Sequence, residues 1–177
     1  MESKFIAHIN EKDGSVQTVL EHSLNTAELS KRFATPEFQE IVYIAGLAHD
    51  LGKWEKDFQK RMRGDSVSVE HSIDGAIEVN KLLPYPIGKL LAYCIAGHHS
   101  GLPDGGNKND EPDFTTLYGR LQRKDRSIYE AYKQELQIPG IDDKEFKQLL
   151  MQDCNNDIQV LVDKFAFFTR YCFSCLT

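Results

Sequence analysis

A chain of 177 residues with 41% hydrophobic and 27% charged residues is long enough for one domain with a sizeable core. Its net charge of −6 argues against a domain that holds nucleic acid by itself, because such domains are usually basic. No segment approaches a membrane span, and the four cysteines show no secreted disulfide framework. We therefore expect a cytoplasmic protein with reduced thiols and no membrane partner.

Along the chain, nearly all the predicted elements are helices. Apolar residues recur at helical spacing, and glycine and proline mark the breaks between segments. The predicted helices span 22–34, 36–48, 53–64, 71–83, 87–99, 113–124, 127–137, 142–153 and 156–176. Because strand signals are nearly absent, the sequence predicts an all-α fold.

One long irregular segment interrupts the helices. The stretch "SGLPDGGNKNDEPD", residues 100–113, is rich in Gly, Pro, Asn and Asp and directly follows a histidine pair. Long loops in compact domains are commonly functional or mobile. We therefore predict a mobile loop over 100–113 beside the site that the histidines form.

Histidines mark the ends of the predicted helices. Five of the six lie in a first or last turn, and one stands beside an aspartate in "AHDLGK", residues 48–53. A single histidine at a helix end is more often a cap or a surface residue than a ligand. The set instead indicates a metal site, and imidazole with carboxylate suits Mn, Fe, Co, Ni or Zn better than Mg alone. These five are His22, His49, His71, His98 and His99.

These motifs carry a resemblance to a known family. "EHSLNTA", "AHDLGK", "EHSIDGA" and "IAGHHSGLPD" resemble the HD superfamily of metal-dependent phosphohydrolases. With "FQ" at 58–59, "HSIDGA" and "AGHHSGLPD", the chain more closely resembles the HD nuclease domain of the CRISPR-associated helicase-nuclease of type I systems. The resemblance runs from about His8 to Asp104, resumes weakly in the last helix and is absent over 105–155. It implies an HD-domain helical bundle with its metal site at clustered helix ends.

The resemblance also implies a site for two divalent ions, with magnesium as a further candidate. His22, His49 and Asp50 would serve one ion, and Asp50 would bridge to a second ion held by His71, His98 and His99. Asp50 and Lys53 would be catalytic, with Lys53 pairing with a substrate phosphate, although a solvated lysine is an equally good reading. The family has a further ligating aspartate after the last apolar helix, so we expect residues 1–177 to be a single HD nuclease domain truncated there. The ion at His22 and His49 would then be the weaker one.

Two segments are basic against the acidic background. "KWEKDFQKRMR" leaves the metal motif directly, so its cations could track a phosphate backbone, although a solvated helix face is equally compatible. Within it, Trp54 and Phe58 could stack on bases, but their spacing of four favours packing into the core. "RLQRKDR", residues 120–126, is the second basic segment. The candidate nucleic-acid-binding residues are Lys56, Lys60, Arg61 and Arg63.

The leading hypothesis is a metal-dependent nuclease that cuts single-stranded DNA in type I CRISPR interference. The resemblance implies two partners: a helicase domain or subunit that feeds the strand, and an RNA-guided surveillance complex that opens the duplex. The alternative is an HD-type phosphodiesterase of cyclic dinucleotides or other small molecules. Those enzymes typically have a glutamate after the second histidine pair, whereas this chain reads "HHSGLPDGG". The third hypothesis is a catalytically impaired metal-binding module.

Overall fold

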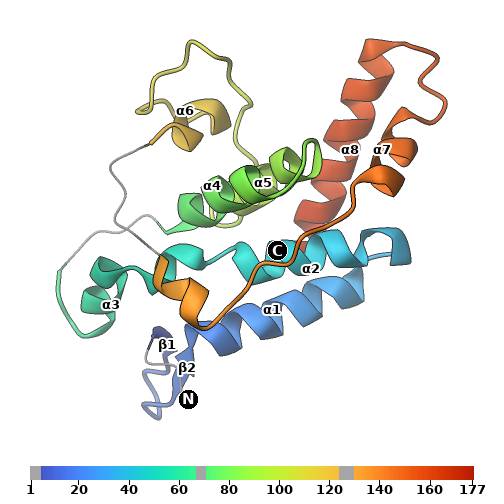
Figure 1. Ribbon diagram of the computed structural model, residues 1–177. Helices are drawn as coiled ribbons and strands as arrows, with labels where there is room; N and C mark the ends of the chain where they lie inside the picture. The colour runs from blue at the N-terminus through green and yellow to red at the C-terminus, as the bar shows by residue number, and fades with distance from the viewer. Residues whose placement is uncertain (1–4, 67–70, 124–129) are drawn as a thin grey trace.

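The computed structural model describes residues 5–66, 71–123 and 130–177 of the chain. Most of these residues lie in helices, as the sequence predicts, and two antiparallel helix pairs form the centre of the fold (Figure 1). The first pair is α1 (Val19–Phe33) with α2 (Gln39–Ala48), and the second is α4 (Ser72–Leu82) with α5 (Ile87–Gly97). The beginnings of α1 and α4 therefore lie at the same end of the bundle as the ends of α2 and α5.

A side-chain cap begins α1 three residues before the predicted start. The Thr18 hydroxyl accepts a hydrogen bond from the Glu21 amide at 3.1 Å, and the Glu21 carboxylate accepts one from the Thr18 amide at 2.9 Å. This capping box satisfies two amides that have no partner inside the helix. It places His22 in the first turn of α1.

Two glycines let the helices of the bundle approach closely. A Cβ at Gly46 of α2 would overlap the backbone of Ala27 in α1. A Cβ at Gly75 of α4 would overlap the carbonyl oxygen of Ala48 at the end of α2. Since protein interiors are close-packed, a larger residue at either position would push the helices apart. Gly75 therefore allows the beginning of α4 to lie directly against the end of α2.

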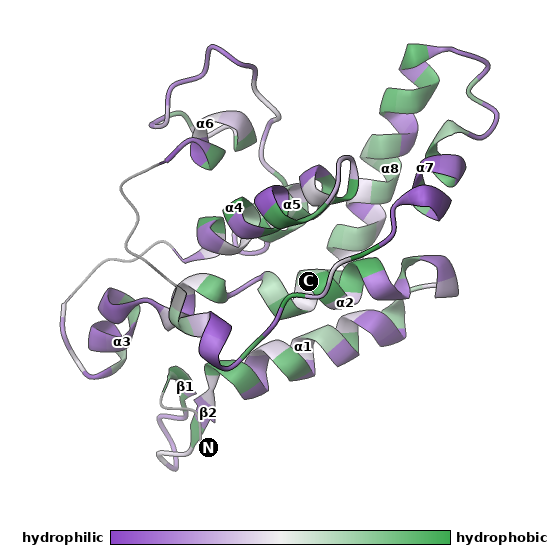
Figure 2. Ribbon diagram, viewed as in Figure 1, coloured by the Kyte–Doolittle hydropathy of each residue, from purple (hydrophilic) through white to green (hydrophobic). Residues whose placement is uncertain are grey.

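The bundle buries one hydrophobic core. Its fully buried side chains come mainly from α2, α4 and α5 and include Val42, Ile44, Leu51, Ile73, Leu90, Leu91 and Ile95. The last helix, α8 (Ile158–Leu176), contacts α1, α2 and α5 and is hydrophobic along much of its length (Figure 2). Among the described helices, none combines the length and hydrophobicity needed to cross a bilayer.

Several elements differ in extent from the predicted helices. The helix expected over 53–64 begins as a 3-10 turn, η2 (Leu51–Trp54), and α3 (Lys56–Met62) follows only after the extended residue Glu55. The helix expected over 36–48 similarly opens with a 3-10 turn before α2. The other elements are η1 (Pro36–Phe38), α6 (Leu117–Leu121), η3 (Glu130–Gln134) and α7 (Lys144–Met151). Residues 124–129 of the predicted helices lie outside the described part of the chain.

A β-hairpin that the sequence pattern did not predict precedes α1. β1 (Ile6–Ile9) pairs with β2 (Val16–Thr18) in an antiparallel register. The buried Gln59 of α3 extends this pairing: its side chain accepts a hydrogen bond from the Ile6 amide at 2.9 Å and donates one to the Ile6 carbonyl at 3.0 Å. Because Gln59 lies 53 residues from Ile6, the sequence around β1 gives little indication of a strand.

The loop after α5 is irregular, as predicted for 100–113, and it continues to the cap of α6 at Thr116. The buried carboxylate of Asp110 organises it by accepting hydrogen bonds from the Asn107 amide at 3.2 Å and from the Thr116 hydroxyl at 2.6 Å. This loop thereby carries α6 back toward α4 and α5, which α6 contacts. Its mobility stays a prediction.

Candidate metal centre

Asp50 lies at the centre of the histidine cluster. α2 ends at Ala48, and the next two residues, His49 and Asp50, are buried, with exposed fractions of 5% and 1%. Asp50 leaves the helix with φ −115° and ψ 27°. Its two carboxylate oxygens then contact different sets of histidines. We call the set around Oδ2 the first group and the set around Oδ1 the second group.

The first group consists of His22, His49 and Asp50. Each imidazole Nε2 lies 3.0 Å from Asp50 Oδ2, and the two nitrogens lie 3.1 Å from each other. His49 Nδ1 lies 2.8 Å from the Gly46 carbonyl oxygen, which can only accept a hydrogen bond. Nδ1 therefore carries the proton and Nε2 presents a lone pair, the form that binds a metal.

The second group consists of Asp50 with His71, His98 and His99. His71 Nε2 and His98 Nε2 each lie 3.4 Å from Asp50 Oδ1. His71 Nε2 also lies 2.8 Å from His99 Nε2. His98 Nδ1 lies 2.7 Å from the Ile95 carbonyl oxygen, so this ring too turns a lone pair on Nε2 toward the cluster.

Electrostatics favours an ionised Asp50 carboxylate beside neutral His71 and His99. Burial alone raises the pKa of Asp50, yet favourable interactions with His49 and the other histidines outweigh it and hold the pKa well below its usual range. Burial lowers the pKa of His71 to about 4 and also lowers the pKa of His99. At neutral pH these two imidazoles are uncharged, as metal ligands must be.

The donor atoms fit divalent metal ions. Within the described residues, the buried atoms Asp50 Oδ1 and His98 Nε2 have no hydrogen-bond partner. In the first group, the Nε2 lone pair of His49 faces Asp50 Oδ2 at 3.0 Å, an arrangement that a shared cation stabilises. Ligand atoms bound at about 2.1 Å to one ion lie roughly 3.0–3.4 Å apart for octahedral to tetrahedral angles. All six predicted ligands thus come together around a candidate site, whose ligation of metal stays a prediction.

Lys53 is not a solvated lysine, so that reading of the sequence is wrong. Its side chain is buried, and Nζ lies 2.9 Å from Asp50 Oδ2. Nζ also lies 3.0 Å from Nε2 of His8, whose ring stands edge-on to that of His22 at 4.9 Å. Burial and the neighbouring Lys53 lower the pKa of His8. A cation in this position stabilises the negative charge of Asp50.

Two residues beside Lys53 were given no role from the sequence. His8 comes from the unpredicted β1 strand and contacts Lys53 directly. Gln59 donates a hydrogen bond to the Lys53 carbonyl at 2.7 Å while it also binds the backbone of Ile6. Gln59 thus connects the hairpin to the turn that carries Lys53. The "FQ" motif at 58–59 was the available signal for this role.

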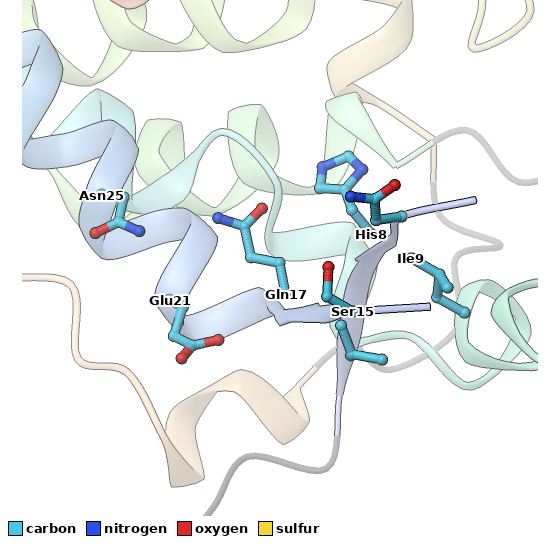
Figure 3. Close-up of a pocket in the computed structure, with 8 residues that line it drawn as sticks. His8, Ile9, Ser15, Gln17, Glu21 and Asn25 are labelled. Atoms are coloured by element: carbon cyan, nitrogen blue, oxygen red, sulfur yellow. The ribbon is translucent and has the colours of Figure 1, made fainter. Parts of the chain in front are cut away.

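A groove opens beside His8, between the hairpin and the beginning of α1 (Figure 3). Its volume is about 560 Å³, and the side chains of Ser15, Gln17, Glu21 and Asn25 line it. No lysine or arginine is among the lining residues that the structure describes. This side of the centre therefore offers hydrogen-bonding groups and one carboxylate instead of positive charge.

The basic residues of α3 lie on the exposed part of that helix. Lys56, Arg61 and Arg63 are exposed, while Lys60 Nζ pairs with Asp57 at 2.7 Å. Figure 2 shows α3 as mostly hydrophilic. The aromatic residues of the segment behave differently: Trp54 and Phe58 are buried, with exposed fractions of 1% and 5%. Trp54 therefore packs in the core, as expected, and Phe58 is buried beside the ring of His71 at 5.3 Å, so the expectation that they stack on bases is wrong.

A comparison with known families agrees with this geometry. A profile of the HD domain family matches residues 19–135, which include all six candidate ligands. A search of curated proteins found no significant match. Because the family match covers more than half of the sequence, the chain belongs to the HD domain family, whose members form a superfamily of metal-dependent phosphohydrolases.

Proposed function

We propose that this chain is a metal-dependent nuclease that hydrolyses phosphodiester bonds of single-stranded DNA in type I CRISPR interference. The observation that carries the proposal is the sharing of one buried carboxylate by two groups of histidines. Two-metal sites of this kind act on phosphodiesters, because paired cations can stabilise both the attacking and the leaving oxygen. The motifs "HSIDGA" and "AGHHSGLPD" support the narrower assignment to CRISPR interference.

The residues of the chain prepare the site in separate ways. Asp50 offers one oxygen to each group and is held ionised by its surroundings. The carbonyls of Gly46 and Ile95 orient His49 and His98 so that both present Nε2. When bound, divalent ions would lower the pKa of a water molecule and neutralise charge on the phosphate. Lys53 balances the charge of Asp50, and its pairing with a substrate phosphate stays a prediction.

The acidic charge of the chain supports a role for partner proteins that hold the DNA while this chain cuts it. A net charge of −6 is unfavourable for holding a long polyanion. We propose that a helicase domain or subunit supplies the strand, that an RNA-guided surveillance complex opens the duplex, and that the system acts in the cytoplasm. The chain itself then needs only local contacts around the scissile phosphate.

The proposal is tested with circular single-stranded DNA and Mn²⁺. We expect linear fragments with the wild-type chain, none with Asp50→Ala and none in the presence of a chelator. A circle has no ends, so linear products establish endonucleolytic cleavage. Hydrolysis of a cyclic dinucleotide together with an uncut circle would contradict the proposal and identify a small-molecule phosphodiesterase. Metal binding without turnover of either substrate would identify a binding module.

A further inference from the structure

A pocket of about 370 Å³ lies next to the segment of chain that leaves the second group. One wall is the loop that directly follows His99, through Ser100 and Gly101. The facing wall is α6 and the residues after it, through Arg120 and Arg123. The pocket therefore lies beside His99, a candidate metal ligand.

Arg120 fixes this wall relative to the metal centre. The side chain is buried, with an exposed fraction of 8%, and Nη1 donates a hydrogen bond to the Ala96 carbonyl at 3.0 Å. Nη2 donates one to the Ser72 hydroxyl at 3.3 Å. Ala96 lies two residues before His98, and Ser72 directly follows His71. One guanidinium thus connects the pocket to both helix ends that carry the second group.

Arg123 adds a second positive charge at the rim of the pocket. Its Nε donates a hydrogen bond to the Pro112 carbonyl at 2.9 Å, which anchors the side chain to the loop. Among the lining residues that the structure describes, the charged ones are Arg120, Arg123 and Asp104. The hydroxyls of Ser100 and Thr115 add neutral hydrogen-bonding groups to the lining. Guanidinium and hydroxyl groups together match a phosphate, which has only acceptor oxygens.

We propose that this pocket binds a backbone phosphate next to the scissile one, on the second-group side of the centre. The inference rests on the proposed nuclease function and names a contact that positions the strand. It also gives a direction to the substrate: the described lining of this pocket contains two arginines, whereas the described lining of the groove beside His8 contains Glu21 and no lysine or arginine. A strand would then cross the centre with one flanking phosphate in the arginine pocket.

The test measures binding of a fluorescein-labelled oligothymidylate by anisotropy, in a chelator that prevents cleavage, over a series of salt concentrations. Each phosphate contact on single-stranded DNA contributes about 0.7 to the slope of log affinity against log salt. We expect Arg123→Ala to lower both the affinity and the slope, the latter by about 0.7. Arg123→Lys should keep the slope, because it retains the charge. The matched control is Arg32→Ala, which removes an exposed arginine from the far end of α1 and should change neither quantity.

An affinity and slope for Arg123→Ala equal to those of the wild type would overturn the proposal. A second arm replaces the oligonucleotide with a cyclic dinucleotide. Binding of that compound alone, dependent on Arg123, would keep the phosphate chemistry but overturn its polymeric source. Failure of the nuclease function looks different, because it appears as an uncut circle in the cleavage assay and not as equal binding by the wild type and Arg123→Ala.

Discussion

The two groups of the candidate metal centre share Asp50 but are held in different ways. The first group has three donors, closely spaced at 3.0–3.1 Å, on the helix pair fixed by the Thr18 cap and Gly46. The second group has four donors, and its contacts to Asp50 are longer, at 3.4 Å. One of its members, His99, is exposed. The first group is thus better preorganised and the second has more ligands.

This difference predicts an order of metal binding. A fourth donor adds a bond to the ion, so we expect the second group to bind its ion more tightly. The first group would gain its ion only at higher metal concentration. The prediction agrees with the weaker ion at His22 and His49 that the family resemblance implies. Substitution of Asp50 alters the ligand that both groups share. Substitutions of Lys53 and Gly75 each alter the support of one group, and substitution of Arg61 alters a surface outside both.

The largest effect should come from Asp50→Asn, because that carboxylate serves both groups. An amide has no negative charge, so each group loses its anionic ligand. We expect cleavage of single-stranded DNA with Mn²⁺ to fall below detection. Glu28→Gln, which neutralises an exposed carboxylate on α1, is the matched control and should cut normally. Cleavage by Asp50→Asn at more than a trace would refute a shared carboxylate.

Lys53→Ala should have the next largest effect, and it concerns the first group. Lys53 contacts Asp50 Oδ2, the oxygen that the first group uses. Loss of a partner that orients a metal ligand typically costs 10–100-fold, so we expect cleavage to fall by about that factor. Steady-state rates with Mn²⁺ measure it, with Lys81→Ala at the far end of α4 as control. Equal rates for the two variants would show that Lys53 does not support Asp50.

Gly75→Ala tests how the second group is held against Asp50. The new methyl would overlap the Ala48 carbonyl oxygen and push the beginning of α4, with the adjacent His71, away from the end of α2. Overpacking of this kind costs about 1–3 kcal/mol of unfolding free energy. Denaturant unfolding should show this loss, and the second group should bind Mn²⁺ more weakly. Gly140→Ala is the control, since a Cβ there meets nothing within 4 Å. Unchanged stability in Gly75→Ala would mean that the helices repack freely.

Arg61→Glu should have the smallest effect of the series. Arg61 is exposed on α3, where an isolated surface charge is worth at most about 1 kcal/mol. We therefore expect DNA cleavage to fall less than about fivefold. The salt dependence of the cleavage rate provides the readout. A loss of cleavage rate larger than that of Lys53→Ala would indicate that α3 contacts the DNA. It would also weaken the proposal that the strand passes through the arginine pocket.

The placement of the histidines at helix ends could be predicted because its signals are local. Histidines beside glycine, aspartate and helix breaks identified the candidate ligands, and apolar spacing identified the bundle. The contacts of Lys53 could not be predicted in the same way. Its burial depends on His8 and Gln59, and Gln59 in turn pairs with Ile6 across 53 residues. Charge patterns alone could not separate an exposed arginine such as Arg61 from one that borders a pocket such as Arg123, since both lie in basic segments.

The long-range position of Arg120 is a similar case. Its segment looked like a second basic run, and the predicted helix over 113–124 was too long because the Asp110 loop continues to Thr116. Only the folded loop brings the guanidinium to Ala96 and Ser72. Local sequence thus specified the candidate ligands, whereas tertiary packing decided which charges stand beside them.

The most direct test of the central claim is the stoichiometry of Mn²⁺ binding, measured by isothermal titration calorimetry. The shared carboxylate predicts two ions per wild-type chain, bound with different affinities. His49→Ala should lose the weaker ion and His98→Ala the tighter one, while Asp50→Asn should lose high-affinity binding altogether. A single ion in the wild type, or two ions undiminished in Asp50→Asn, would contradict a binuclear centre built on Asp50.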